Sequence, residues 1–288
     1  MPEISAKSVN ELRQRTGCGL MDCKKALVEA EGDIERGIEL LRQRGLAKAA
    51  KRADRQRREG TVALALSNDR TAGAIVEINC ETDFVARNEA FLAFAEAVAQ
   101  AVCADARLAD ADALRAATHS AGGTFGQKLD DLTNALRENI GLGRIARRQV
   151  PSGWIDGYVH FDRKRGAMVQ LAWSGGARPA EPPEGLGKDL GMQIVVPPIP
   201  LALRREDIPA DEVEKERRIH LGADDLQKKP EQIRGKIVEG RLAKWYQEQV
   251  LLEQPFIKDD AQSVATHVSK VGGGKVTLTG YDYAIVGV

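Results

Sequence analysis

The hydrophobic pattern of this 288-residue chain begins with the period of helices. Between residues 4 and 45, apolar side chains recur at helical spacing and are separated by two glycine-containing breaks. The pattern predicts three short helices, with Ser5 or Ser8 capping the first and Asp33 capping the third. Three helices in about 40 residues form a compact but only marginally stable module.

At Gly60 the pattern changes to the alternation typical of β-strands. Two apolar runs flank a polar turn at residues 68–70, which predicts a β-hairpin whose second strand stops at Asn79 and Cys80. Three helices and one further strand are predicted after it, at residues 88–102, 109–118, 125–136 and 144–150. Together these elements predict a two-layer unit with helices on a sheet.

The second half of the chain repeats this theme and then departs from it. Its predicted strands lie at residues 154–160, 167–173 and 275–286. Residues 207–248 contain two long charged helical patterns joined by a turn at Lys229 and Pro230, which predicts an antiparallel helical hairpin. A last helix is predicted at residues 260–271, just before the strand that closes the sheet.

The expected fold class is α+β, with an N-terminal three-helix module, a two-part core with antiparallel sheets, and an inserted antiparallel helical hairpin. The expected parts are 1–46 for the module, 47–59 for a basic linker, 60–150 for the N-terminal core subdomain, 151–203 with 249–288 for the C-terminal one, and 204–248 for the hairpin.

Composition narrows the classes of function. Acidic and basic residues are balanced at 42 each, which argues against a uniformly basic nucleic-acid binder. The four cysteines are irregularly spaced, and Cys18 and Cys23 lack the spacing and partners of a zinc site, so reduced thiols are expected. The N-terminus has no apolar signal core, and prolines interrupt the longest apolar run, at residues 194–203. These features predict a soluble cytoplasmic protein without a membrane segment.

The sequence contains no recognisable catalytic set. Its four histidines are scattered, a GxxxxGK[ST] phosphate loop is absent, and Gly141 and Gly143 lack the third glycine and following helix of a dinucleotide motif. We therefore expect no enzyme activity, cofactor, metal site or small-molecule substrate. A thiol enzyme using Cys80 and Asp83 is an alternative from another class. Any role in GTP chemistry would have to act on another protein's nucleotide site.

Residues 47–59 combine six basic side chains with Asp54 and Glu59. The segment has little to bury, so it is predicted to be an exposed linker. The alternative is a contact to RNA phosphates, but no aromatic residue interleaves the charges to stack a base. Nucleic acid is therefore not the expected partner.

The stretch EINCETDFVAR, residues 77–87, places a large aromatic at a strand-to-helix corner. The strand stops at Cys80, a polar turn follows at residues 81–83, and a helical pattern begins after Asn88. Rigid corners are where proteins present functional side chains, whereas most phenylalanines are buried. Phe84 is thus interpreted either as a lid on the local core or as an exposed functional side chain.

Three segments carry a resemblance to a known family. They are LRQRTGCGLMDCKKAL at residues 12–27, EINCETDFVAR at residues 77–87, and KIVEGRLAKWY at residues 236–246, which is followed by QPFIKDD. The first two resemble the N-terminal and second signatures of the elongation factor Ts family, in the right order and at about the right distance. The third extends the resemblance over most of the chain.

The resemblance implies guanine-nucleotide exchange on elongation factor Tu during translation elongation, and a UBA-like fold for the N-terminal three-helix module. In the family, the TDFV corner lies beside the magnesium site of the GTPase, and here Thr82, Asp83, Phe84 and Val85 occupy it. Phe84 would displace a helix next to the ion, dislodge Mg²⁺ and promote GDP release. Asp83 would supply local charge and hydrogen bonding.

The resemblance also implies further contacts to elongation factor Tu, in its GDP-bound and nucleotide-free forms. The corresponding positions are Lys24, Leu136, Arg137, His160, Ile257 and Lys258. Leu136 and Arg137 stand where relatives have an Ile–Gly pair, and Lys258 replaces a hydrophobic residue. The resemblance is compatible with a homodimer within a two-plus-two complex, and the chain departs from relatives that carry an additional C-terminal helical module.

One alternative function is an RNA- or ribosome-associated binding protein built on the basic linker and the small N-terminal bundle. Lys24 and Lys25 adjoin on the second predicted helix of that bundle. Adjacent helical residues point in different directions, so the pair does not form a basic patch by itself.

Overall fold

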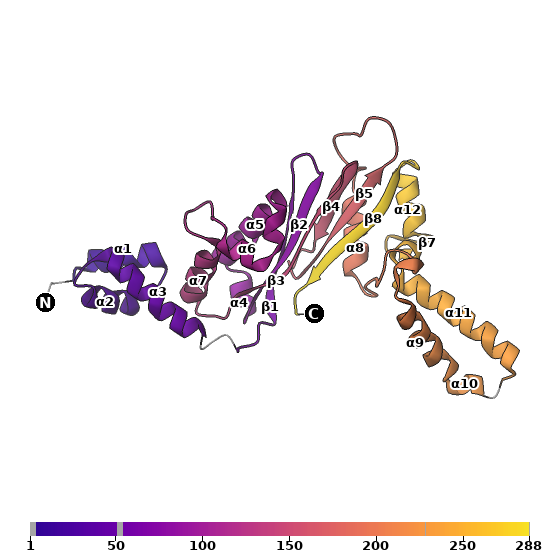
Figure 1. The fold of residues 1–288 in the computed structure, drawn as a ribbon, viewed down its shortest axis with the longest axis horizontal. Coiled ribbons are helices and arrows are strands. Elements are labelled where there is room, and N and C mark those ends of the chain that lie inside the picture. Colours follow the sequence, from indigo (N-terminus) through magenta and orange to yellow (C-terminus); the bar gives the residue numbers. More distant parts are fainter. Residues whose placement is uncertain (1–3, 51–53, 228, 288) are drawn as a thin grey trace.

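The computed structural model describes residues 4–50, 54–227 and 229–287 of the chain. The molecule is elongated: a helical module, two sheets with their helices, and a helical hairpin follow one another (Figure 1). The module contains α1, α2 and α3, which span Ala6–Thr16, Leu20–Glu29 and Ile34–Ala50. Mixed helix and antiparallel sheet behind a three-helix module confirm the predicted α+β class.

Caps and apolar spacing define the N-terminal module. Ser5 caps α1, because its hydroxyl accepts the backbone N–H of Ser8 at 3.1 Å, and Asp33 caps α3. Leu12 and Leu27 are fully buried between the helices. The third helix continues to Ala50, so the segment predicted as a linker begins as helix, consistent with its alanines. Lys51 and Arg52 of that predicted linker lie outside the described residues.

The first sheet has the strand order β1-β2-β3 and is antiparallel. Its strands are β1 (Glu59–Leu66), β2 (Ala72–Cys80) and β3 (Gly141–Gln149). The helices of this subdomain are α4 (Asp83–Ala86), α5 (Glu89–Ala104), α6 (Ala111–Ala116) and α7 (Phe125–Leu136), with a 3-10 turn at Ala106–Ala109. The long helix α5 packs along the sheet and buries Phe91 and Val98 against it. The predicted hairpin and its turn are confirmed.

The second sheet, with the order β4-β5-β8, is also antiparallel. Its strands are β4 (Gly153–Val159), β5 (Arg165–Trp173) and β8 (Val276–Ile285), and α8 (Leu186–Val195) and α12 (Val264–Val271) pack beside it. The two sheets face each other through an apolar layer that includes Val62, Ile75 and Met168. The core is therefore stacked as helix, sheet, sheet and helix.

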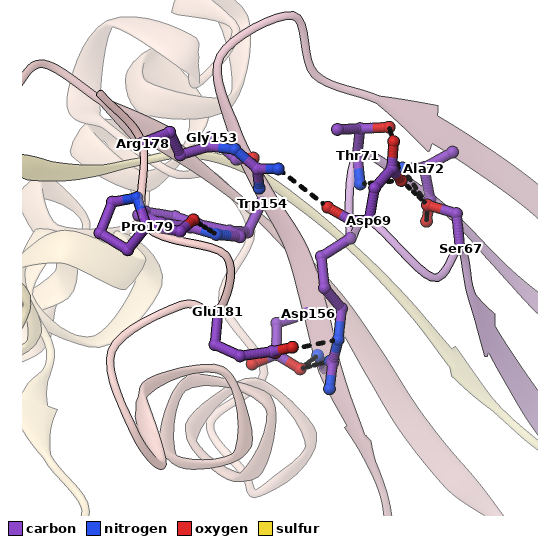
Figure 2. A network of polar contacts seen from close by, with 12 residues as sticks. Ser67, Asp69, Thr71, Ala72, Gly153, Trp154, Asp156, Arg178, Pro179 and Glu181 are labelled. Carbon is purple, nitrogen blue, oxygen red and sulfur yellow. Dashed lines mark hydrogen bonds and ion pairs between the residues drawn. The ribbon is translucent and has the colours of Figure 1, made fainter. Parts of the chain in front are cut away.

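A polar clasp joins the turn of the first hairpin to the second sheet (Figure 2). Arg70 forms an ion pair with Asp156 at 3.0 Å and a longer one with Glu181 at 3.7 Å. Arg178 donates to the carbonyls of Gly153 and Asp69. The hairpin turn is thus tied both to β4 and to the loop that leads into α8.

The helical hairpin projects away from the sheets (Figure 1). It consists of α9 (Ala210–Leu221), the short α10 (Asp224–Gln227) and α11 (Glu231–Gln249), flanked by 3-10 turns at Arg205–Asp207 and Leu251–Glu253. In the described residues no helix is long and apolar enough to cross a membrane.

One predicted element is wrong. Residues 260–271 do not form a single helix, because the first of them belong to β7 (Asp259–Ser263), which pairs with β6 (Pro255–Phe256). Helix α12 begins only at Val264, where the Ser263 hydroxyl accepts the N–H of Thr266 at 3.2 Å. The cap residue divides the segment into a strand and a helix.

Candidate functional site

The corner after β2 exposes Phe84 and buries the residues that follow it. Thr82 is the N-cap of the one-turn helix α4, and its hydroxyl accepts the N–H of Val85 at 3.4 Å. Val85 and Ala86 are buried in the core of the first subdomain. Phe84 is 84% exposed, so its interpretation as a lid on the local core is wrong.

The corner is held by Glu138, which lies in the loop between α7 and β3. The Thr82 hydroxyl donates to one oxygen of this carboxylate at 2.5 Å, and the backbone N–H groups of Glu81 and Thr82 donate to the other at 3.0 Å each. In return, the Glu81 carboxylate accepts the N–H of Asn139 at 2.6 Å. This reciprocal set fixes the backbone from which Phe84 projects.

Asp83 lies beside Phe84 and is partly exposed. Its carboxylate pairs with Arg87 one turn further on, at 3.3 Å. Such an exposed pair contributes little to stability, so Asp83 remains accessible to a partner's hydrogen-bond donors.

Cys80 lies under the corner and is fully buried. Its thiol donates to the carbonyl of Thr82 at 3.2 Å. Burial, together with the nearby charge of Glu138, raises the pKa of the Cys80 thiol to about 12. The thiol is therefore protonated at neutral pH, which makes it a poor nucleophile and removes the basis for a thiol enzyme.

Lys24 lies on the outer face of α2, among apolar residues that are also exposed. Leu20 and Val28 stand one turn before and one turn after it, and Met21 adjoins them. A solvent-exposed stripe of large apolar side chains around a lysine is suited to contact with a partner. The apolar members of this stripe were not predicted, although their helical spacing is visible in the sequence.

Leu136 and Arg137 occupy the end of α7, where the first subdomain meets the N-terminal module. Leu136 is partly buried against the core, and Arg137 is the C-cap residue with a left-handed φ of 62°. The Arg137 guanidinium pairs with Asp22 of α2 at 3.4 Å. The pair therefore joins the two parts of the chain.

His160 lies at the end of β4, and the residue after it is the second strongly exposed phenylalanine. The His160 ring contacts the hydroxyl of Tyr158 at 2.7 Å and the ring of Phe161 at a centroid distance of 4.5 Å. Phe161 is 88% exposed. An aromatic inside the polar turn FDRKRG is the sequence signal that could have identified it.

Ile257 and Lys258 lie in the turn between β6 and β7. Ile257 is exposed, and its N–H donates to the side chain of Gln193 at 2.7 Å. The Lys258 ammonium pairs with Asp189 of α8 at 2.5 Å. This pair fixes the turn on α8 and leaves the isoleucine facing solvent.

The structure brings two of these features together and separates the others. The corner and the turn with Phe161 lie at the same end of the two sheets, since Cys80 pairs with Glu59 and the Glu59 carboxylate contacts Lys164 at 2.6 Å. Lys24 lies on α2 in the N-terminal module, and Ile257 lies in the turn before β7, which lies beside the base of the helical hairpin (Figure 1). No group of His, Cys, Asp and Glu in the described part of the chain is arranged to hold a metal ion.

Comparison with known proteins identifies the family. The sequence profile described as Elongation factor TS matches residues 81–287. The chain belongs to the elongation factor Ts family. Proteins named elongation factor Ts from Prosthecochloris aestuarii and Sphingopyxis alaskensis are 43% and 44% identical to it, over 97% and 98% of this chain and 97% and 92% of theirs. That from Chlorobium limicola is 46% identical over 90% of this chain and 89% of its own.

Membership of the elongation factor Ts family makes the chain a translation elongation factor. The matched segment begins at Glu81, so it contains the exposed corner but not the three-helix module. The Prosthecochloris and Sphingopyxis relatives also cover nearly all of this chain, so their similarity includes the module.

Proposed function

We propose that this elongation factor Ts family member is a guanine-nucleotide exchange factor that binds GDP-bound elongation factor Tu, dislodges its Mg²⁺ and promotes GDP release. The observation that carries the proposal is the exposure of Phe84 on a hydrogen-bonded corner. A large apolar side chain held in water gains free energy when it is buried in a partner.

The proposed mechanism is a thermodynamic coupling. A protein that binds the nucleotide-free state of a GTPase more tightly weakens the nucleotide's affinity by the same factor. In GTPases of this kind, Mg²⁺ bridges the phosphates and contributes much of the nucleotide's affinity. Displacing an element next to the ion is therefore a direct way to speed release. Phe84 would act as the wedge, and Asp83 would supply charge and a hydrogen-bond acceptor beside it.

The chain needs no nucleotide site of its own for this role, so we propose that it is not an enzyme and uses no cofactor. Thr82 and Val85 would orient the corner, because one caps α4 and the other anchors it in the core. Lys24, His160 and Ile257 would make further contacts to the partner, each from a different part of the elongated molecule. Phe161 would extend the contact at His160.

The test is a fluorescence measurement of GDP release. Elongation factor Tu carrying a fluorescent GDP analogue is mixed with excess GDP and increasing amounts of the chain, for wild type and for Phe84→Ala. Burying a phenylalanine contributes about 1.5–3 kcal/mol. We therefore expect Phe84→Ala to lower the release rate at saturation about tenfold or more, with binding retained.

Phe161→Ala is the matched control, because it removes an equally exposed ring at the same end of the sheets. It should leave the saturating rate unchanged and only raise the concentration needed to reach it. Acceleration that survives Phe84→Ala would exclude Phe84 as the wedge, and no acceleration by wild type would refute the exchange function.

A further inference from the structure

A cavity of about 710 Å³ opens between the two sheets. The strands β3 and β8, which lie at the edges of their sheets, form its walls, and residues 55–58 close it from the side. Its charged and aromatic lining consists of Arg55, Arg57, Arg58, Glu77, Arg144 and Tyr283. The arginines outnumber the single carboxylate, so the cavity is positively charged.

The four arginines differ in how far their charge is already neutralised. Arg55 contacts the carboxylate of Glu81 at 3.4 Å, and Arg144 lies 3.9 Å from Asp282. Arg57 and Arg58 form no ion pair within the described ranges of the chain. Their charges are therefore the ones available to a ligand among the lining arginines.

Glycines create the space that the arginines occupy. A Cβ atom on Gly141 would come within 1.5 Å of Nη1 of Arg57, so this guanidinium lies directly on the glycine backbone. A Cβ on Gly143 would come within 2.5 Å of the Asn79 side chain and crowd Glu77 on the cavity floor. The two glycines of the segment Gly141–Gly143 thus keep this part of β3 open.

We propose that this cavity binds a small polyphosphate anion. Guanidinium groups match the geometry of phosphate oxygens and bind them in pairs of parallel hydrogen bonds. The volume lies in the range of small-molecule sites, which is about 300–1,000 Å³. Glu77 is buried in the lining, so its carboxylate disfavours an anion beside it and favours one near the arginines.

A polyphosphate fits the lining better than a strand of RNA. Strand binding needs a basic groove with aromatic rings on which successive bases stack. Tyr283 is the one aromatic among the lining residues, and the Arg144 guanidinium already lies over its ring at 5.2 Å. The charges converge on one cavity instead of following a track.

The site also adjoins the corner that carries Phe84. Arg55 lines the cavity and contacts Glu81, whose carboxylate accepts the N–H of Asn139 next to Glu138. A bound anion that attracts Arg55 would compete with Glu81 for it. This link is independent of the exchange function, because the anion site is defined by binding alone.

Calorimetric titration of the full chain with inorganic triphosphate, in buffer without divalent cations, tests the proposal. We expect saturable binding that weakens with salt and falls at least tenfold in Arg57→Gln/Arg58→Gln. Lys215→Gln/Arg217→Gln, which removes the same charge from the helical hairpin, should leave the affinity unchanged.

The source of the phosphates is distinguished by titrating pyrophosphate and GDP in parallel. Equal affinities would assign recognition to the phosphates alone, and tighter binding of GDP would assign it to a nucleotide; both support the site. Absence of saturable binding, or equal loss in the hairpin control, would overturn the proposal. So would a single-stranded RNA 12-mer that binds more tightly than triphosphate and displaces it.

Discussion

At the scale of single residues, the exposure of Phe84 depends on neighbours that are hidden. Val85 and Ala86 fill the core, so the side chain before them must point outward from the one-turn helix α4. Glu138 then accepts three hydrogen bonds from the backbone and side chain of the two residues before α4. The corner is rigid because one carboxylate organises it.

Removing that carboxylate should loosen the corner without touching Phe84. Glu138→Ala leaves the N–H groups of Glu81 and Thr82 without their acceptor. Losing these hydrogen bonds should lower the free energy of unfolding by about 1–3 kcal/mol. We expect a lower free energy of unfolding in urea and slower stimulation of GDP release from elongation factor Tu. Glu184→Ala, which removes an exposed carboxylate from the loop before α8, is the control. Unchanged release in Glu138→Ala would show that the corner needs no such support.

The sequence could locate this corner but could not decide the direction of Phe84. The local pattern identified the strand end, the polar turn and the aromatic, all of which are contiguous. Its orientation depends on Glu138, which lies 56 residues from Thr82 in the sequence and follows a different helix. Such a pairing leaves no local signal. Phe161 was not predicted, although its position beside a polar turn was a local sequence signal.

At the scale of elements, the facing sheets are joined by polar contacts at their edges as well as by the apolar layer between them. Asp282 of β8 is buried, and Arg148 of β3 donates to both of its carboxylate oxygens, at 2.7 and 3.0 Å. The same hydrogen bonds raise the pKa of the Arg148 guanidinium. This bidentate contact links the outer strand of one sheet to the outer strand of the other.

A double-mutant cycle should measure that link. Arg148→Ala leaves a buried carboxylate with only a long contact to Arg144, so we expect it to be the more harmful single change. Unfolding of Arg148→Ala, Asp282→Asn and the double variant should give a coupling free energy of about 1.5–3 kcal/mol. A coupling near zero would mean that this contact adds nothing to the apolar layer and the polar clasp of Arg70 and Arg178.

Elements with local determinants were predicted well, and those set by distant pairing were not. The hairpin of β1 and β2 and the three N-terminal helices follow from alternation, helical spacing and caps. The single helix predicted at residues 260–271 was wrong, because β7 forms through its pairing with β6. Apolar spacing gave no sign that Ser263 starts the helix at that point.

At the scale of the whole molecule, the residues proposed to contact the partner are spread along the long axis. The corner with α4 lies near the middle, α2 with Lys24 lies in the N-terminal module, and β7, which follows Ile257, lies beside the base of the helical hairpin (Figure 1). An arrangement of this kind would separate the residues that set affinity for the partner from the residue that speeds GDP release. In the proposed exchange function, the outer contacts would hold the partner in register, and the central corner would act on its nucleotide site.

This separation predicts that Lys24→Glu and Phe84→Ala have opposite kinetic signatures. Lys24 is exposed on α2, so reversing its charge should mainly alter association, which charged rims control. We expect the concentration for half-maximal GDP release to rise about three- to tenfold, with a salt dependence, while the saturating rate stays unchanged. Lys25→Glu is the matched control, because the adjacent side chain points in another direction from the same helix. A lower saturating rate in Lys24→Glu would mean that the module takes part in displacing the nucleotide. An equal effect of Lys24→Glu and Lys25→Glu would assign the change to net charge instead of to the stripe around Lys24.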